Sequence, residues 1–130
     1  MNTSTLALTL LRIVAAVLFF SHGAQKVFGW FGGMGPGGAS ASLMSLMGAA
    51  GVIEVVTATG IGLGLAPRLL AFIASGEMAV AYFYQHVRGS HSLWWWENRG
   101  EVAILYCFLW LYFAAAGAGP ISVDRIRGKR

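Results

Sequence analysis

Charged side chains are scarce in this chain of 130 residues. They make up 11% of the sequence, whereas an ordinary soluble domain has about 25%. Hydrophobic residues account for 57%, and the length suits a single domain. The shortage of charge excludes a typical soluble protein and indicates an integral membrane protein.

Cysteine is almost absent as well. Cys107 is the single cysteine, which excludes a dithiol mechanism within one chain. Lysine and arginine are missing from the first five residues, so the basic segment that opens a secretory signal peptide is lacking. We therefore expect the first apolar run to stay in the protein as a helix.

Motifs for several common chemistries are missing too. We find no Ser-His-Asp set and no carboxylate pair at the spacing of a hydrolase. The glycine-rich residues 28–42 lack a phosphate-binding GxxxxGKS or GxxxxGKT motif. The histidines are His22, His86 and His91, and they leave a haem, or a zinc site completed by Glu97, as minor alternatives. We expect no metal, and the residues alone do not identify a cofactor.

Long apolar segments are what the sequence has in abundance. Four of them, residues 6–27, 43–66, 68–87 and 101–118, have roughly the 17 to 25 residues that span a bilayer. A soluble bundle would show a polar stripe along each helix, and no segment has one. We predict an all-α membrane protein, a four-transmembrane-helix bundle in a single domain over residues 1–130.

Basic residues are distributed unevenly about these segments. One side of the predicted bundle carries both termini and most of the basic residues, namely Arg68, Arg125, Arg127, Lys129 and Arg130. The other side has Lys26, Arg88 and Arg99. The positive-inside rule then places both termini in the cytoplasm, and we expect a multi-pass protein of the inner (plasma) membrane. Membrane lipid is the expected partner of the basic tail, rather than nucleic acid.

Five ionisable residues lie within the predicted helices, and these are Arg12, His22, Lys26, Glu54 and Glu77. A charge at the bilayer centre costs at least ~2.5–3.5 kcal/mol, so such residues usually face the bundle interior and pair. At about 100° per residue, Arg12, His22 and Lys26 lie within an arc of roughly 80° on one face of the first helix. The two glutamates fall at similar depth in the next two helices. We predict that the five residues form one polar intramembrane seam.

The predicted seam has a structural and a functional interpretation, and the sequence leaves both open. In the structural one, Lys26 extends to lipid head groups, His22 bonds a neighbouring helix, and Arg12 pairs with Glu54 or Glu77 to set helix register. In the functional one, the seam binds a small polar or redox-active ligand, for which the head group of a quinone is a candidate.

The order of these residues resembles the DoxX family of small four-helix membrane proteins. The stretch "LLRIVAAVLFFSHGAQKVFGWFGG" is similar to the start of that family, with an Arg early in the first helix and then a His-Gly-x-x-Lys-x-Phe-Gly run. Matching positions further along are Glu54, Gly60, Gly62, Gly64, Arg68 and Glu101. The ending "GAGPISVDRI" is similar to the closing Gly-Pro-x-Ser-x-Asp of the family. The resemblance covers nearly the whole chain.

The resemblance implies topology more strongly than activity. The family is named for the small membrane subunit of a thiosulfate:quinone oxidoreductase, and other members resemble membrane partners of superoxide dismutase and sulfurtransferase systems. A shared fold does not carry a shared reaction, so whether the chain is an enzyme stays open.

Three functional hypotheses follow. The first is a quinone-associated component of a redox or detoxification complex. The second is a non-enzymatic membrane adaptor, or assembly partner, for a soluble redox enzyme. The third is a small-solute carrier. A protein partner is compatible with the first two, and a homo-oligomer through the GxxxG of residues 60–64 is compatible with the third.

Overall fold

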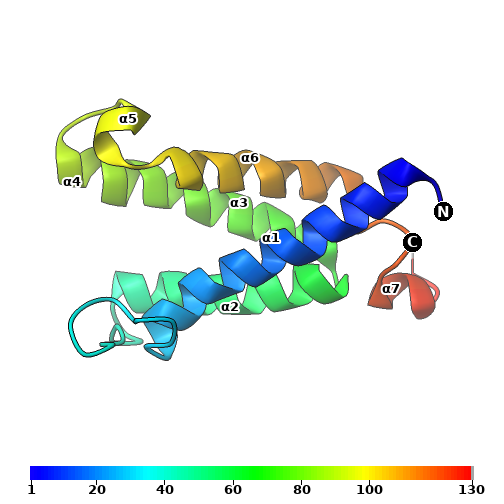
Figure 1. Ribbon diagram of the computed structural model, residues 1–130, viewed down its shortest axis with the longest axis horizontal. Coiled ribbons are helices and arrows are strands. Elements are labelled where there is room, and N and C mark those ends of the chain that lie inside the picture. The colour runs from blue at the N-terminus through cyan, green and yellow to red at the C-terminus, as the bar shows by residue number, and fades with distance from the viewer. Residues whose placement is uncertain (130) are drawn as a thin grey trace.

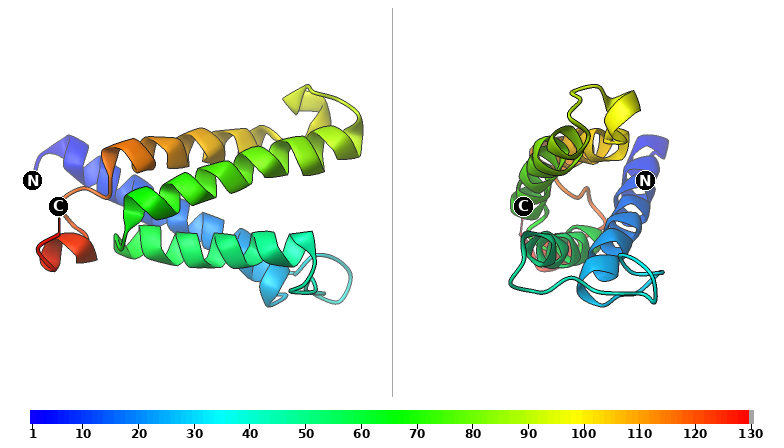
Figure 2. Two further views of the ribbon diagram at one scale, coloured as in Figure 1. Left: turned by 180° about the vertical axis from the view of Figure 1, so that it is seen from behind. Right: turned by 90° about the vertical axis from the view of Figure 1, so that its left-hand side faces the viewer.

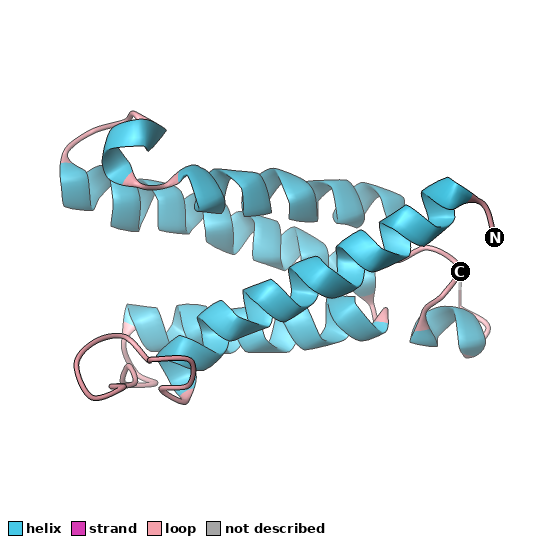
Figure 3. Ribbon diagram, viewed as in Figure 1, coloured by secondary structure: helices cyan, strands magenta, loops and turns pink. Residues whose placement is uncertain are grey.

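The computed structural model describes residues 1–129, and every regular element in that range is a helix (Figure 3). The elements are α1 (Thr3–Val27), α2 (Leu46–Leu63), α3 (Pro67–Ala81), the π-helix η1 (Tyr82–Val87), α4 (Arg88–Ser90), α5 (Trp95–Asn98), α6 (Glu101–Ala116) and α7 (Val123–Ile126). Because α3, η1 and α4 follow one another without a break, residues 67–90 form one long helical rod.

Local signals set where the long helices begin and end. The side chain of Asn2 accepts a hydrogen bond from the Thr5 amide and caps α1, and Ser45 caps α2 in the same way. Gly64 ends α2 in the left-handed conformation, with φ of 74°. Pro67 then opens α3 at a position where its missing N–H costs nothing. These caps make α2 shorter than the expected segment 43–66.

The long helices pack as two pairs joined by a tight turn. In Figure 1, α1 crosses α2, and α6 runs along α3. The pairs meet near the turn between α2 and α3 and diverge toward the opposite end of the molecule (Figure 2). Both chain ends lie at the turn end of the molecule (Figure 1). The divergence leaves space between the pairs at the far end.

Aromatic packing connects the two pairs where they approach each other. Phe19 of α1 is fully buried, and its ring centroid lies 5.0 Å from that of Tyr106 and 5.3 Å from that of Trp110 on α6. Trp110 and Phe113 continue this core toward the turn end. A tilted or edge-on arrangement at such distances is the preferred geometry of aromatic pairs.

Large apolar side chains also cover the outside of the molecule. They include Val17, Phe72, Leu105 and Phe108, each more than 60% exposed. By length and composition, α1 and α2 are each able to cross a membrane, and α6 is a shorter apolar helix. An exterior this apolar is suited to lipid rather than to water.

Candidate functional site

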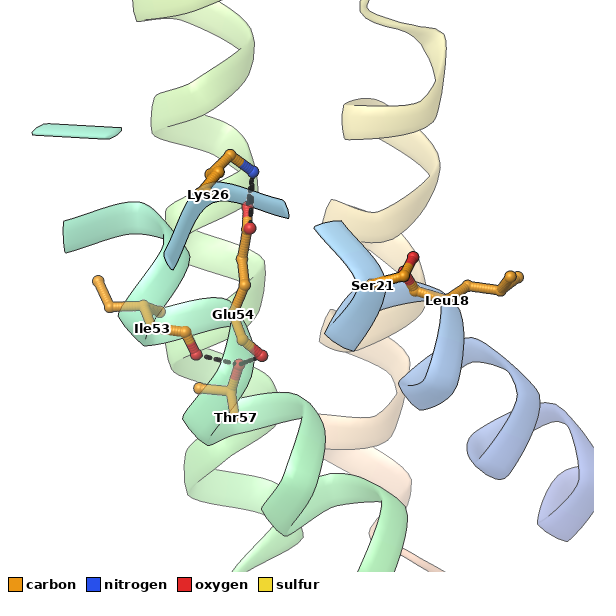
Figure 4. Close-up of polar contacts among 6 residues, drawn as sticks. All are labelled: Leu18, Ser21, Lys26, Ile53, Glu54 and Thr57. Carbon is orange, nitrogen blue, oxygen red and sulfur yellow. Dashed lines mark hydrogen bonds and ion pairs between the residues drawn. The ribbon is translucent and has the colours of Figure 1, made fainter. Parts of the chain in front are cut away.

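An ion pair between Lys26 of α1 and Glu54 of α2 is the centre of the site. The Lys26 ammonium donates to both carboxylate oxygens of Glu54, at 2.9 Å and 2.6 Å (Figure 4). The Glu54 side chain is 1% exposed and that of Lys26 is 17% exposed. Lys26 therefore faces the bundle interior, and its ammonium offsets the charge of a carboxylate that is almost completely buried.

Two glycines bring these side chains together. A Cβ on Gly23 would lie 2.8 Å from the Gly51 carbonyl oxygen and 2.9 Å from the Glu54 Cβ. A Cβ on Gly51 would in turn lie 2.8 Å from the Lys26 Cβ. The backbones of α1 and α2 touch at this crossing because neither glycine has a side chain. The crossing places position 26 of one helix directly beside position 54 of the other.

Glu77 of α3 adds a second carboxyl group to the pair. Its side chain lines the same cavity as those of Glu54 and Lys26. The Oε2 atom of Glu77 is buried and has no protein partner among the described residues. Two carboxyl groups and the Lys26 ammonium thus line one cavity, and the Oε2 atom of Glu77 is left available to a further hydrogen-bonding group.

A cavity of about 670 Å³ lies against this cluster. Its polar wall includes Lys26, Glu54, Glu77 and His22, and the ring of Tyr106 lies beside them. The remaining wall is mostly apolar and includes residues of α1, α2, α3, η1 and α6. A largely apolar cavity of this size with a few converging polar groups is typical of small-molecule sites.

His22 lines the cavity, and its side chain makes no hydrogen bond to a neighbouring helix within residues 1–129. Its ring is edge-on to Tyr106, with 6.0 Å between the ring centroids, and it is exposed in the isolated chain. Ser21, the preceding residue, turns away and donates to the Leu18 carbonyl of its own helix at 2.6 Å (Figure 4). His22 therefore has its ring nitrogens free for a molecule in the cavity.

Arg12 does not belong to this cluster, and the expected pairing with Glu54 or Glu77 is wrong. Its side chain is 3% exposed, and its Nη1 donates to the Ala118 carbonyl just beyond α6. Arg68 donates to the carbonyls of Ala115 and Ala116 at the same helix end. The last carbonyls of a helix have no partners within the helix, so Arg68 caps α6. Arg12 anchors the segment that follows the helix, through the Ala118 carbonyl.

The outer end of the cavity is organised by Asn98, a residue that no sequence pattern indicates. Asn98 is buried, and its Nδ2 donates to the Tyr82 hydroxyl at 3.2 Å and to the Ser92 carbonyl at 3.1 Å. Its backbone carbonyl accepts from Nδ1 of His86 at 3.0 Å. His86 lies on η1, and π-helical segments often occur at functional sites. An asparagine at the end of a four-residue helix carries no signal in the sequence that would reveal these contacts.

The zinc alternative finds no support in the arrangement of these side chains. Across residues 1–129, no three His, Cys, Asp or Glu side chains gather in a way that could hold a metal ion. His22 and His86 both line the large cavity, but His91 and Glu97 do not.

The DoxX family matches residues 7–87. The chain belongs to the DoxX family. Its matched part includes most of α1 and all of α2 and α3, and therefore Lys26, Glu54 and Glu77. This DoxX protein is a membrane protein with two candidate spans, α1 and α2.

A relative of this DoxX chain is a protein of Haemophilus influenzae (strain ATCC 51907 / DSM 11121 / KW20 / Rd) that is described as uncharacterized. The two are 45% identical over 119 residues, which is 90% of this chain and 87% of the relative. No solved structure is significantly similar to this chain.

Proposed function

We propose that this DoxX protein is a four-span membrane protein that binds the head group of a quinone, or of a similar small amphiphile, as a component of a redox or detoxification complex. The observation that supports the proposal is the second carboxyl group, Glu77, which lines the same mostly apolar cavity as the Lys26–Glu54 ion pair. Ionisable groups in a membrane interior are costly and usually serve a function.

The chemistry of the cluster suits a ligand with carbonyl or hydroxyl groups. Lys26 and a protonated carboxyl donate hydrogen bonds, whereas an ionised carboxylate accepts them. A quinone presents acceptors and a quinol presents donors, so a cluster that holds both kinds of group can bind either form. His22 and the Tyr106 ring, which lie on the same cavity wall, would pack against the planar head group.

Four spans and cytoplasmic termini complete the proposal. The helical rod of residues 67–90 and the apolar α6 are the two further spans, and α6 is 16 residues long. With both termini at one end of the molecule, the basic tail lies at the cytoplasmic face of the inner membrane. A green fluorescent protein fused to the C-terminus should fluoresce, and alkaline phosphatase fused after Gly33 should be active. An active phosphatase at the C-terminus would overturn this orientation.

Ligand binding is tested by native mass spectrometry of the protein extracted gently from its own membrane, followed by titration with decylubiquinone. We expect one bound molecule per chain. Glu77→Gln keeps the size of the side chain and removes its charge, and it should weaken binding at least tenfold. A charged hydrogen bond is worth roughly 1.5–3 kcal/mol, and tenfold in affinity corresponds to about 1.4 kcal/mol.

Glu101→Gln is the matched control. Glu101 is an exposed carboxylate at the start of α6 and does not line the cavity, so its substitution should leave binding unchanged. Absence of binding to the unmodified protein would overturn the proposed function. A co-purified protein in place of a bound quinone would instead favour the adaptor hypothesis.

A further inference from the structure

The cavity has one side wall that is apolar and uncharged. This side lies between α2 and α3, and its exposed lining residues are Leu46 and Ala49 on α2 and Ile73, Gly76 and Val80 on α3. Leu46 is 57% exposed and Val80 is 59% exposed, although both line the cavity. A residue that lines a cavity and is also exposed marks an opening, so one opening of the cavity lies between these two helices. The exposed lining residues Arg99 and Val102 mark another at the start of α6.

The helix arrangement explains why the opening lies there. α2 and α3 are joined by a tight turn and diverge from it, as the view from behind in Figure 2 shows. On the opposite side, α1 carries the polar residues His22 and Lys26 into the cavity. These two side chains and the apolar opening therefore lie on different sides of one cavity, whereas Glu54 and Glu77 come from the two helices that flank the opening.

Gly76 lines the opening and has open space beside it. It lies in the middle of α3, next to Glu77, and a Cβ added to it would meet no atom within 4 Å. It follows Pro67 by nine positions, which is about 14 Å along a helix at 1.5 Å per residue. In a membrane-spanning helix this depth belongs to the hydrocarbon region and not to the head groups.

We infer that the gap between α2 and α3 at Gly76 is a lateral portal, through which an amphiphile with a hydrocarbon tail enters from the bilayer. The ligand's polar head reaches Lys26, Glu54 and Glu77, and its tail leaves between the two helices into lipid. This inference rests on the proposed function and narrows its ligand to a molecule that is dissolved in the membrane. A water-soluble solute would have no need of an apolar opening at this depth.

Two probes with the same head group test the portal on the full-length protein. Decylubiquinone has a ten-carbon tail, and 2,3-dimethoxy-5-methyl-1,4-benzoquinone has none. Gly76→Leu places a branched side chain in the open space, and Ala49→Leu narrows the facing wall. Gly89→Leu is the matched control, because Gly89 is also helical, a Cβ added to it would meet no atom within 4 Å, and it lies outside the cavity.

We expect Gly76→Leu and Ala49→Leu to lower occupancy by decylubiquinone at least tenfold in native mass spectra and to leave the tailless probe unchanged. Gly89→Leu should change neither. If both portal variants bind both probes as the unmodified protein does, the portal is refuted and the proposed function stands. An equal loss of both probes also refutes it, because the substitutions would then have altered the head-group site. If neither probe binds the unmodified protein, the proposed function itself fails.

Discussion

Replacing Gly23 by alanine tests whether the contact between α1 and α2 builds the site. The added Cβ would lie 2.8 Å from the Gly51 carbonyl oxygen and 2.8 Å from the Val55 amide nitrogen. Ordinary contacts of this kind begin at 3.4 Å, so the two helices must separate by about 0.6 Å at a close-packed contact. The obstructing atoms are backbone, and no flexible side chain can give way.

The expected loss of stability follows from two opposing effects. Overpacking of a well-packed contact costs about 1–3 kcal/mol, and obstruction by backbone atoms places this case near the upper value. Alanine is a better helix former than glycine by about 1 kcal/mol, which offsets part of the cost. We expect Gly23→Ala to lower the free energy of unfolding by about 2 kcal/mol, or roughly 30-fold in the equilibrium constant.

Unfolding in mixed micelles of dodecyl maltoside and increasing sodium dodecyl sulfate, followed by circular dichroism, measures this difference. Gly76→Ala is the control, because its Cβ meets no atom within 4 Å. That variant should gain stability, by up to about 1 kcal/mol. If the two variants have the same stability within about 0.5 kcal/mol, the crossing of α1 and α2 is not the close contact that we describe.

Three further predictions use the same unfolding assay. Lys26→Met should lower the free energy of unfolding by about 3–5 kcal/mol, because it leaves the buried Glu54 carboxylate without its cation. Adding Glu54→Leu should recover at least half of that loss. Additive losses in the double variant would contradict the pairing. Arg12→Ala should lower the free energy of unfolding by about 1.5–3 kcal/mol through the lost bond to a buried carbonyl, whereas Arg125→Ala, at an exposed position, should change it by no more than about 0.5 kcal/mol. Equal effects would contradict the anchoring of the segment after α6 by Arg12. Asn98→Ala should lower the free energy of unfolding by about 1–3 kcal/mol. It should also speed amide hydrogen exchange in residues 91–100, and unchanged exchange would contradict the organising role of Asn98.

Several features of the fold could be predicted because they depend on local chemistry. The scarcity of charge predicts a membrane protein, since charged groups are costly in lipid. Gly64 and Pro67 mark the turn between two helices through their own backbone preferences. The π-helix at residues 82–87 could not be predicted, because a helical register of this kind depends on packing around it rather than on a residue pattern.

The candidate site, too, could be predicted from the sequence only in part. The sequence indicates that Glu54 and Glu77 lie at similar depth, because both fall near the middle of adjacent apolar segments. It also places two cations, Arg12 and Lys26, and His22 on one face of the first helix. It does not say which of those cations meets the glutamates, because helical periodicity describes one helix at a time.

The sequence by itself determined the helical membrane class, the family, and the requirement that Glu54 have a partner. Only the tertiary structure decided that the partner is Lys26 and not Arg12. The two cations lie 14 positions apart, or about 21 Å along a helix. The close approach at Gly23 and Gly51 selects the end of α1 that lies beside Glu54, and it leaves Arg12 near the end of α6. A crossing point is a property of two backbones in contact, and no single segment of sequence contains it.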